Sequence, residues 1–351
     1  MMTSIKKSFL ITIVICLLSF LFYSCEKDNG MEWRGIDLPE ISDVLLAMED
    51  TAFMEYCLDY FDTDGNWRLS MAEAAAVEVI NIPSYKYSIK SLKGIEYFTS
   101  LTSLDCSYKS IKSLDLSNNR FLTTLQCHHN EIEGLTVSNN PLLTSINCMK
   151  NNLSCLDVSK NKELKQLYCH SNHITHLDVS NARNLAELYC SDNDLTSLDI
   201  TNNKVLTTLD CGSNKLGNLN VSKNTLLTTL DCNNNQISSL DVSKNTALIS
   251  LNCAGNKFSG LNVKNNIALT HLTCNNNLLE TLDISRNPAL GILYSYDNRM
   301  TNLDVSNNLA LYFLNCGQQD RPLTVIYTYG QDVDTWKKSD LNSDVIWKQK
   351  E

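Results

Sequence analysis

The residues best equipped for chemistry are oxygen-bearing side chains that recur at short intervals between positions 62 and 73. Hard cations such as Ca²⁺ take carboxylate and amide oxygens as ligands. The surrounding segment 26–78 holds fourteen acidic and only three basic residues, so its charge also favours a bound cation. The pattern therefore predicts a Ca²⁺ site made by Asp62, Asp64, Asn66, Ser70 and Glu73.

Segment 62–73 resembles the calcium-binding loop of an EF-hand. In that loop, positions 1, 3, 5, 9 and 12 supply side-chain oxygens, position 7 supplies a backbone carbonyl, and position 8 is apolar. The resemblance implies that Arg68 contributes its carbonyl and that Leu69 is the apolar residue. The departure is Trp67, which stands where glycine normally permits the sharp turn. A polar helix–turn–helix that binds no ion is the alternative.

Apolar residues upstream of this loop recur at helical spacing, and alanines follow it at 74–76. A helix is therefore predicted over 42–61, and a second one directly after the loop. Residues 40–79 are expected to form a short helical, EF-hand-like cap. The apolar stripe of the first helix consists of Leu45, Leu46, Met48, Phe53, Tyr56 and Cys57.

From Leu101 onward the sequence repeats every 21 residues as L-x-x-L-x-C-x-x-N-x-L/I-x-x-L-D-V-S-x-N-x-x, and such a fixed period predicts a solenoid. Alternate residues of the L-x-C and L-D-V segments point inward, which predicts two short strands per turn and two parallel sheets. Asparagines such as Asn130 and Asn140 end each strand and can bond the backbone of the bend. The units begin at Leu101, Leu122, Leu143, Leu164, Leu185, Leu206, Leu227, Leu248, Leu269 and Leu290, with a partial turn from Leu311.

This repeat resembles the leucine-rich repeats of bacteria, specifically the short class in which L-x-x-L-x-L-x-x-N occurs twice in 21 residues. The resemblance covers residues 80–320 and implies a mainly β leucine-rich-repeat solenoid with two parallel sheets. The ends of a solenoid need closing because a bare terminal turn exposes its core. We expect the helical cap at the front, with Ile89, Leu92, Ile95 and Phe98, and a small β-rich cap over 321–351 at the back. Trp336 and Trp347 are expected in the core of the second cap.

A column of cysteines runs through the repeats. Stacked inward side chains lie parallel, whereas a disulfide needs converging Cβ atoms. We therefore expect free thiols that pack as small hydrophobic groups. Cys57 and Cys155 lie outside the column and are expected to be buried thiols as well. The column consists of Cys106, Cys127, Cys148, Cys169, Cys190, Cys211, Cys232, Cys253, Cys274 and Cys316, with Ser295 in the remaining turn.

The N-terminus has the layout of an export signal, because Lys6 and Lys7 precede an apolar run over 9–22 that is short for a membrane span. The following Phe-Tyr-Ser-Cys resembles a bacterial lipobox, although Phe22 and Tyr23 replace the usual aliphatic and small residues. This implies a signal peptide over 1–24 and lipidation at Cys25. An uncleaved anchor and plain secretion are the alternatives.

A lipidated tether is expected over 25–39, and its residues 26–30 resemble the short acidic segments that direct some Gram-negative lipoproteins to the cell exterior, although a solvated linker would look the same. We therefore expect an outer-membrane lipoprotein that is exposed at the cell surface and contacts the membrane through its lipid.

The outward residue before each cysteine varies from turn to turn, whereas the second face repeats aspartate, which indicates a structural role in the bend. Tyr168 and Tyr189 occupy the variable position in adjacent turns, with His170 beside them. Such a patch suits a protein hot spot or stacking against sugar rings. A ladder of strand-forming residues without function is the alternative. The predicted ligand-binding face comprises Tyr108, His129, Tyr168, His170, Tyr189, Tyr294 and Tyr296.

Several functions are disfavoured by the 351-residue sequence. Its net charge of -10 works against nucleic acid as a partner, because phosphate contacts need clustered Lys and Arg. It contains no nucleophile elbow, phosphate loop or paired-cysteine zinc motif, so no catalytic residue is assigned. His170, His173 and His176 fall on a strand, a bend and the next strand, which disfavours zinc.

The sequence therefore predicts a non-enzymatic, exported lipoprotein whose solenoid binds a macromolecule, with protein binding or adhesion as its function. A glycan-binding accessory of an uptake system, a passive surface spacer and an enzyme are the alternatives.

Overall fold

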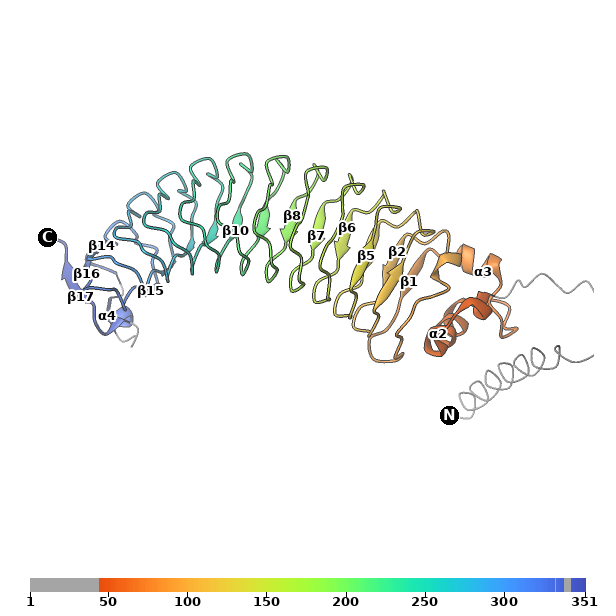
Figure 1. Cartoon of the computed structure of the whole chain (residues 1–351). Coiled ribbons are helices and arrows are strands. Elements are labelled where there is room, and N and C mark those ends of the chain that lie inside the picture. Colours follow the sequence, from red (N-terminus) through yellow and green to blue (C-terminus); the bar gives the residue numbers. More distant parts are fainter. Residues whose placement is uncertain (1–43, 332, 338–341) are drawn as a thin grey trace, which may run out of the picture. The chain divides into compact units, whose positions relative to one another are not determined.

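The structure is a computed structural model that describes residues 44–331, 333–337 and 342–351 (Figure 1). The predicted signal peptide, the tether and Cys25 lie outside these residues. The described part is a mainly β solenoid of stacked parallel strands with few helices. None of its helices combines the length and the apolar character that crossing a membrane requires.

Short helices precede the repeats. The predicted helix over 42–61 is interrupted, because the carboxylate of Asp50 accepts the amides of Ala52 and Phe53 and starts a new helix there. Ser70 and Glu73 form a capping box that starts the next helix at Met71, so this helix begins within the last positions of the loop and not after it. The helices are η2 (Val44–Ala47), α2 (Thr51–Phe61), α3 (Met71–Ala76), η3 (Ile95–Tyr97) and, near the C-terminus, α4 (Val333–Lys337).

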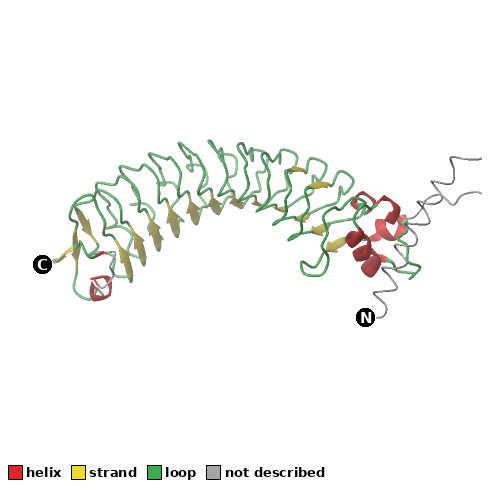
Figure 2. Ribbon diagram, turned by 60° about the horizontal axis from the view of Figure 1, so that its bottom comes forward, coloured by secondary structure: helices red, strands yellow, loops and turns green. Residues whose placement is uncertain are grey.

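Twelve three-residue strands form one parallel sheet along the solenoid, which we call the long sheet. In Figure 2 its strands line the concave side of the arc of repeats. The central residue of each strand points inward, and equivalent residues pair across turns, as Leu209 pairs with Leu230. The strands are β1 (Val79–Asn81), β2 (Ser103–Asp105), β4 (Thr124–Gln126), β6 (Ser145–Asn147), β7 (Gln166–Tyr168), β8 (Glu187–Tyr189), β9 (Thr208–Asp210), β10 (Thr229–Asp231), β11 (Ser250–Asn252), β12 (His271–Thr273), β13 (Ile292–Tyr294) and β15 (Phe313–Asn315).

The second predicted sheet is discontinuous. β3 (Ser113–Asp115) pairs with β5 (Gly134–Thr136), and β14 (Asn302–Asp304) pairs with β16 (Thr324–Tyr327), which also pairs with β17 (Ile346–Gln349). Between these two groups the described chain forms only isolated bridges on this side.

The repeated aspartates of this side are engaged in turns. Each carboxylate accepts the backbone amide two residues farther on, which turns the chain directly after the outward residue. Asn220 makes the same bond to Ser222, so the turn needs the oxygen and not its charge. The predicted structural role of the aspartates is therefore confirmed. The residues are Asp115, Asp157, Asp178, Asp199, Asp241, Asp283 and Asp304.

Two columns of buried asparagines bond adjacent turns together. In one, the amide nitrogen of Asn214 donates to the carbonyls of Cys190, Cys211 and Gly212, while its oxygen accepts the amide of Leu195. In the other, Asn203 donates to carbonyls of the preceding turn, and equivalent asparagines do so along the repeat. These bonds satisfy backbone groups that the bends would otherwise leave buried without partners.

The cysteine column packs in the core as predicted. All twelve cysteines in the described residues are free, and the ten members of the column are buried. Burial raises the pKa of the Cys148 thiol to about 12, so the thiol stays protonated and behaves as a small apolar group. The expectation for Cys57 is confirmed, but that for Cys155 is wrong because Cys155 is exposed. It precedes the inward-facing Leu156, and strand alternation therefore turns it outward.

Both ends of the solenoid are covered. At the front, the hydroxyl of Tyr56 accepts the amide of Asn81 and donates to its carbonyl, which closes the free edge of β1. At the back, Asn342 accepts the amide of Cys316 and donates to the carbonyl of Leu314 beside β15. The predicted cap residues are placed accordingly: Ile89, Leu92, Ile95, Phe98 and Trp336 are buried, and Trp347 is half-buried.

Candidate binding face and metal site

The outward side of the long sheet carries the predicted aromatic patch. The rings of Tyr168 and Tyr189 stack with their centroids 5.0 Å apart and an interplanar angle of 18°. Burial, followed by the neighbouring carboxylate of Glu187, raises the pKa of Tyr168, whose hydroxyl donates to that carboxylate. His170 is half-buried, and burial lowers its pKa. The sheet therefore holds two tyrosines in fixed positions next to one neutral imidazole.

The other predicted aromatic residues form two separate groups on the same side. Tyr108 stacks on His129 with centroids 4.2 Å apart. Toward the C-terminal end of the sheet, the ring centroids of Tyr294 and Phe313 lie 4.8 Å apart. Tyr296 follows on the same turn as Tyr294. The seven predicted residues thus divide among three places along the long sheet.

The sequence analysis missed three side chains of this surface. Glu187 accepts the hydroxyl of Tyr168, Phe313 packs on Tyr294, and the exposed Tyr312 lies beside Gly291. Strand alternation was sufficient to find Glu187 and Phe313, because each stands two residues before an outward position already considered.

The long sheet presents an acidic outward surface. None of its strands contains a lysine or arginine, whereas four outward positions carry Asp105, Glu187, Asp210 and Asp231. Burial raises the pKa of Asp231, which accepts hydrogen bonds from Asn233 and Asn252. Carboxylates on a partly buried surface attract a complementary basic partner.

The predicted Ca²⁺ loop brings three of its carboxylates together. Asp62, Asp64 and Glu73 each offer an oxygen within 4.8 Å of the others. Asn66 adjoins them, since its amide nitrogen donates to Asp64 at 2.7 Å. Trp67 adopts the left-handed φ of 64° that glycine normally supplies. The loop thus reaches the compact turn despite its tryptophan, and the hard oxygen donors suit Ca²⁺.

The same loop is also held by its own hydrogen bonds. One oxygen of Glu73 accepts from the amide and hydroxyl of Thr63, and the other accepts from Ser70. The bonds from the Ser70 amide and the Thr63 side chain lower the pKa of Glu73 to about 2. The side chain of Arg68 is exposed, in keeping with a role expected only for its carbonyl.

The three histidines considered for zinc are dispersed. His173 and His176 are exposed, whereas His170 is half-buried and follows β7 by two residues. Among the described residues, three or more candidate metal ligands come close together in one place, the loop at 62–73.

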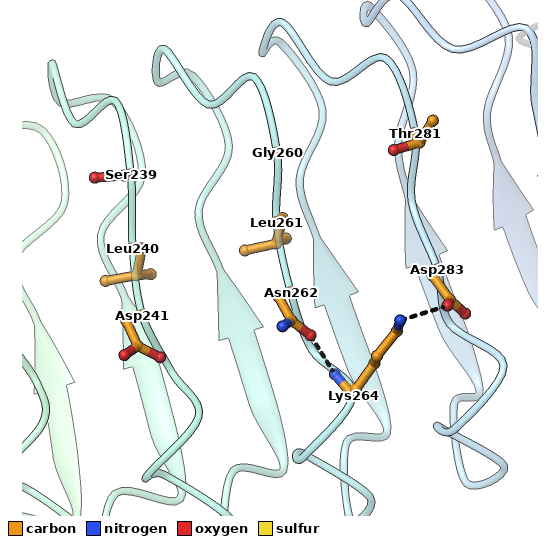
Figure 3. Close-up of a pocket in the computed structure, with 9 residues that line it drawn as sticks. All are labelled: Ser239, Leu240, Asp241, Gly260, Leu261, Asn262, Lys264, Thr281 and Asp283. Carbon is orange, nitrogen blue, oxygen red and sulfur yellow. Dashed lines mark hydrogen bonds and ion pairs between the residues drawn. The ribbon is translucent and has the colours of Figure 1, made fainter.

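A shallow hollow of about 440 Å³ lies on the aspartate-bearing side (Figure 3). Gly260 opens it, because nothing lies within 4 Å of the position a side chain would take there. Lys264 crosses its edge and pairs with Asp283 at 3.1 Å, and its backbone amide bonds Asn262. The polar groups at this edge therefore already bond one another.

Comparisons with known proteins place the fold. No protein-family model matches the sequence, and no curated protein matches it. Among solved structures, the functional domain of InlJ from Listeria monocytogenes, which includes a cysteine ladder, is 27% identical with a TM-score of 0.64. That alignment covers 81% of this chain and 75% of the InlJ chain.

Two further structures share this fold at lower identity. The internalin InlF of Listeria monocytogenes is 19% identical, with a TM-score of 0.64 over 79% of this chain and 92% of its own. The plant peptide hormone receptor RGFR1, solved in complex with RGF2, is 19% identical, with a TM-score of 0.52 over 78% of this chain and 55% of its own. The chain is thus a leucine-rich-repeat solenoid similar to bacterial proteins of this architecture.

Proposed function

We propose that this chain is a non-enzymatic scaffold that binds a protein partner on the outward side of the long sheet. The observation that carries the proposal is the contrast between the two sides. Outward residues of the long sheet vary from turn to turn and include stacked aromatic rings, whereas the outward position of the other side repeats aspartate. Specific recognition needs a surface that is not uniform. The fold shared with internalins and with a receptor solved in complex with RGF2 supports a protein-interaction role.

A protein fits the aromatic patch better than a glycan does. Sugar rings stack on exposed aromatic faces. Because Tyr168 and Tyr189 stack on each other, one face of each ring is already occupied. The acidic strands around them favour a basic protein surface. The test is capture of a protein by the full-length chain in detergent, followed by dissociation constants for variants of each side. Capture of glycans alone on an array would favour the uptake accessory instead.

We further propose that Cys25 carries a lipid that anchors the protein in the outer membrane, exposed at the cell surface. The apolar run, Ser24 and the acidic tether support this. Replacing Cys25 with alanine is expected to remove metabolic lipid label and release the protein from the membrane fraction. An unlabelled wild type, or a Cys25→Ala protein that remains in the membrane fraction, would show that the chain is not held by this lipid.

We also propose that the loop at 62–73 binds Ca²⁺ and fixes the front cap. Millimolar Ca²⁺ is expected to raise the melting temperature of the wild type, because an ion that binds only the folded state stabilises it. In Glu73→Gln the rise should disappear, since the change removes one carboxylate while retaining a residue able to cap α3.

Glu55→Gln is the matched control for the calcium experiment, because Glu55 is exposed on α2 and outside the loop. Its response to Ca²⁺ should equal that of the wild type. Calorimetry that detects no Ca²⁺ binding to the wild type at millimolar concentration refutes the site.

A further inference from the structure

Two adjacent histidines converge at the end of β4. In an extended strand, successive side chains point to opposite sides. At His129 the backbone instead has a left-handed φ of 53°, which brings its ring to the same side as that of His128. The two Nδ1 atoms lie 2.9 Å apart. Two nitrogens this close share either a proton or a metal ion.

The surroundings hold the pair in place. Tyr108 stacks on His129 and meets His128 edge-on, with centroids 5.0 Å apart in the second contact. The carbonyl of His128 accepts the amide of Tyr108 from the preceding turn, and the amide of His129 donates to Met149 in the following turn. Ring and backbone positions are therefore fixed from both neighbouring turns, which reduces the ordering that a ligand must impose.

The distance between the nitrogens selects the geometry of an ion. With metal–nitrogen bonds of about 2.0–2.1 Å, nitrogens 2.9 Å apart subtend an angle of about 90° at the metal. That angle belongs to square-planar and octahedral ions, whereas tetrahedral coordination, as in structural zinc sites, needs a wider one. Tetragonal nitrogen and oxygen ligation is typical of Ni²⁺ and Cu²⁺.

We propose that His128 and His129 bind a divalent tetragonal metal ion, Ni²⁺ or Cu²⁺, through their two Nδ1 atoms. Both rings stay neutral: the ring that carries its proton on Nδ1 moves it to Nε2, so no net proton is released. Water fills the remaining positions of the ion. The ion would lie beyond the C-terminal end of β4, open to donor groups of a bound protein.

The test is calorimetric titration of the full-length protein in detergent with Ni²⁺, which avoids the oxidation of exposed Cys155 that Cu²⁺ would cause. Excess Ca²⁺ is present to occupy the loop at 62–73. The wild type is expected to bind one Ni²⁺ at this pair, and His128→Gln and His129→Gln should each weaken that binding at least tenfold. The second change suits the backbone, because Gln318 already occupies the matching position of a later turn with a φ of 56°.

His271→Gln is the control, since His271 is an exposed histidine on the same sheet. It should bind Ni²⁺ as the wild type does. Absence of saturable Ni²⁺ binding to the wild type would mean that the two rings only share a proton, and the proposal would fail. Equal Ni²⁺ affinity in wild type, His128→Gln and His129→Gln would place the ion elsewhere and refute it as well.

Discussion

Simultaneous replacement of Tyr168 and Tyr189 by alanine is expected to weaken binding of the captured protein about tenfold or more. Truncating an aromatic hot-spot residue costs about 2 kcal/mol or more, and each 1.4 kcal/mol is a factor of ten in affinity. The melting temperature should change little, because both side chains stand outward on the sheet and Glu187 keeps its bond from Gln166. Titration of the partner over each immobilised protein gives the two dissociation constants, and their ratio measures the loss of affinity.

The matched control removes two tyrosines from elsewhere. Tyr85 and Tyr329 are 90% and 89% exposed and lie outside the long sheet, so Tyr85→Ala with Tyr329→Ala should leave the affinity unchanged. Normal binding by the Tyr168→Ala, Tyr189→Ala protein, combined with loss of binding after changes at Asp241 and Asp283, would assign recognition to the other side of the solenoid.

Replacing Asn214 with alanine is expected to destabilise the solenoid by about 3 kcal/mol, because each buried polar group left without its partner costs about 1–3 kcal/mol. The change removes the acceptor of the Leu195 amide and the donor to three carbonyls in one step. Thermal or denaturant unfolding followed by circular dichroism measures the loss. Neighbouring turns should be affected most, since each repeat contacts only its neighbours.

Asn202→Ala provides the comparison for this experiment. Asn202 is exposed, and the equivalent positions of the next two turns hold Lys223 and Lys244, so the site tolerates other side chains. Its replacement should change the free energy of unfolding by less than about 0.5 kcal/mol. Equal free energies of unfolding for the Asn214→Ala and Asn202→Ala proteins would mean that the asparagine column contributes no stability.

The 21-residue period predicted most of the solenoid, because a fixed period gives each position of the repeat the same environment in every turn. The buried cysteines, the bonding asparagines and the outward Tyr168 and Tyr189 all follow from this rule. The burial of Cys155 was predicted from its residue type and not from its column, and among the described cysteines this is the prediction that is wrong. Its column also holds Gly134 and His176, which indicates an outward position.

Other features depend on local backbone geometry that periodicity does not report. The convergence of His128 and His129 requires a left-handed residue three positions after β4, and alternation alone separates the two rings. Likewise, the break before α2 comes from one carboxylate, that of Asp50, acting as a cap within an otherwise helical pattern. The identity of the partner depends on a second molecule, so the sequence of this chain specifies only its chemistry.

The most direct test of the binding side is a photo-crosslinking comparison. A photo-reactive residue is placed at position 189 in one protein and at position 241 in another, and each is irradiated with the captured partner. Tyr189 stands on the long sheet, whereas Asp241 lines the hollow on the other side. The account predicts a crosslinked partner from position 189 and none from position 241. A crosslink from position 241 alone would contradict it.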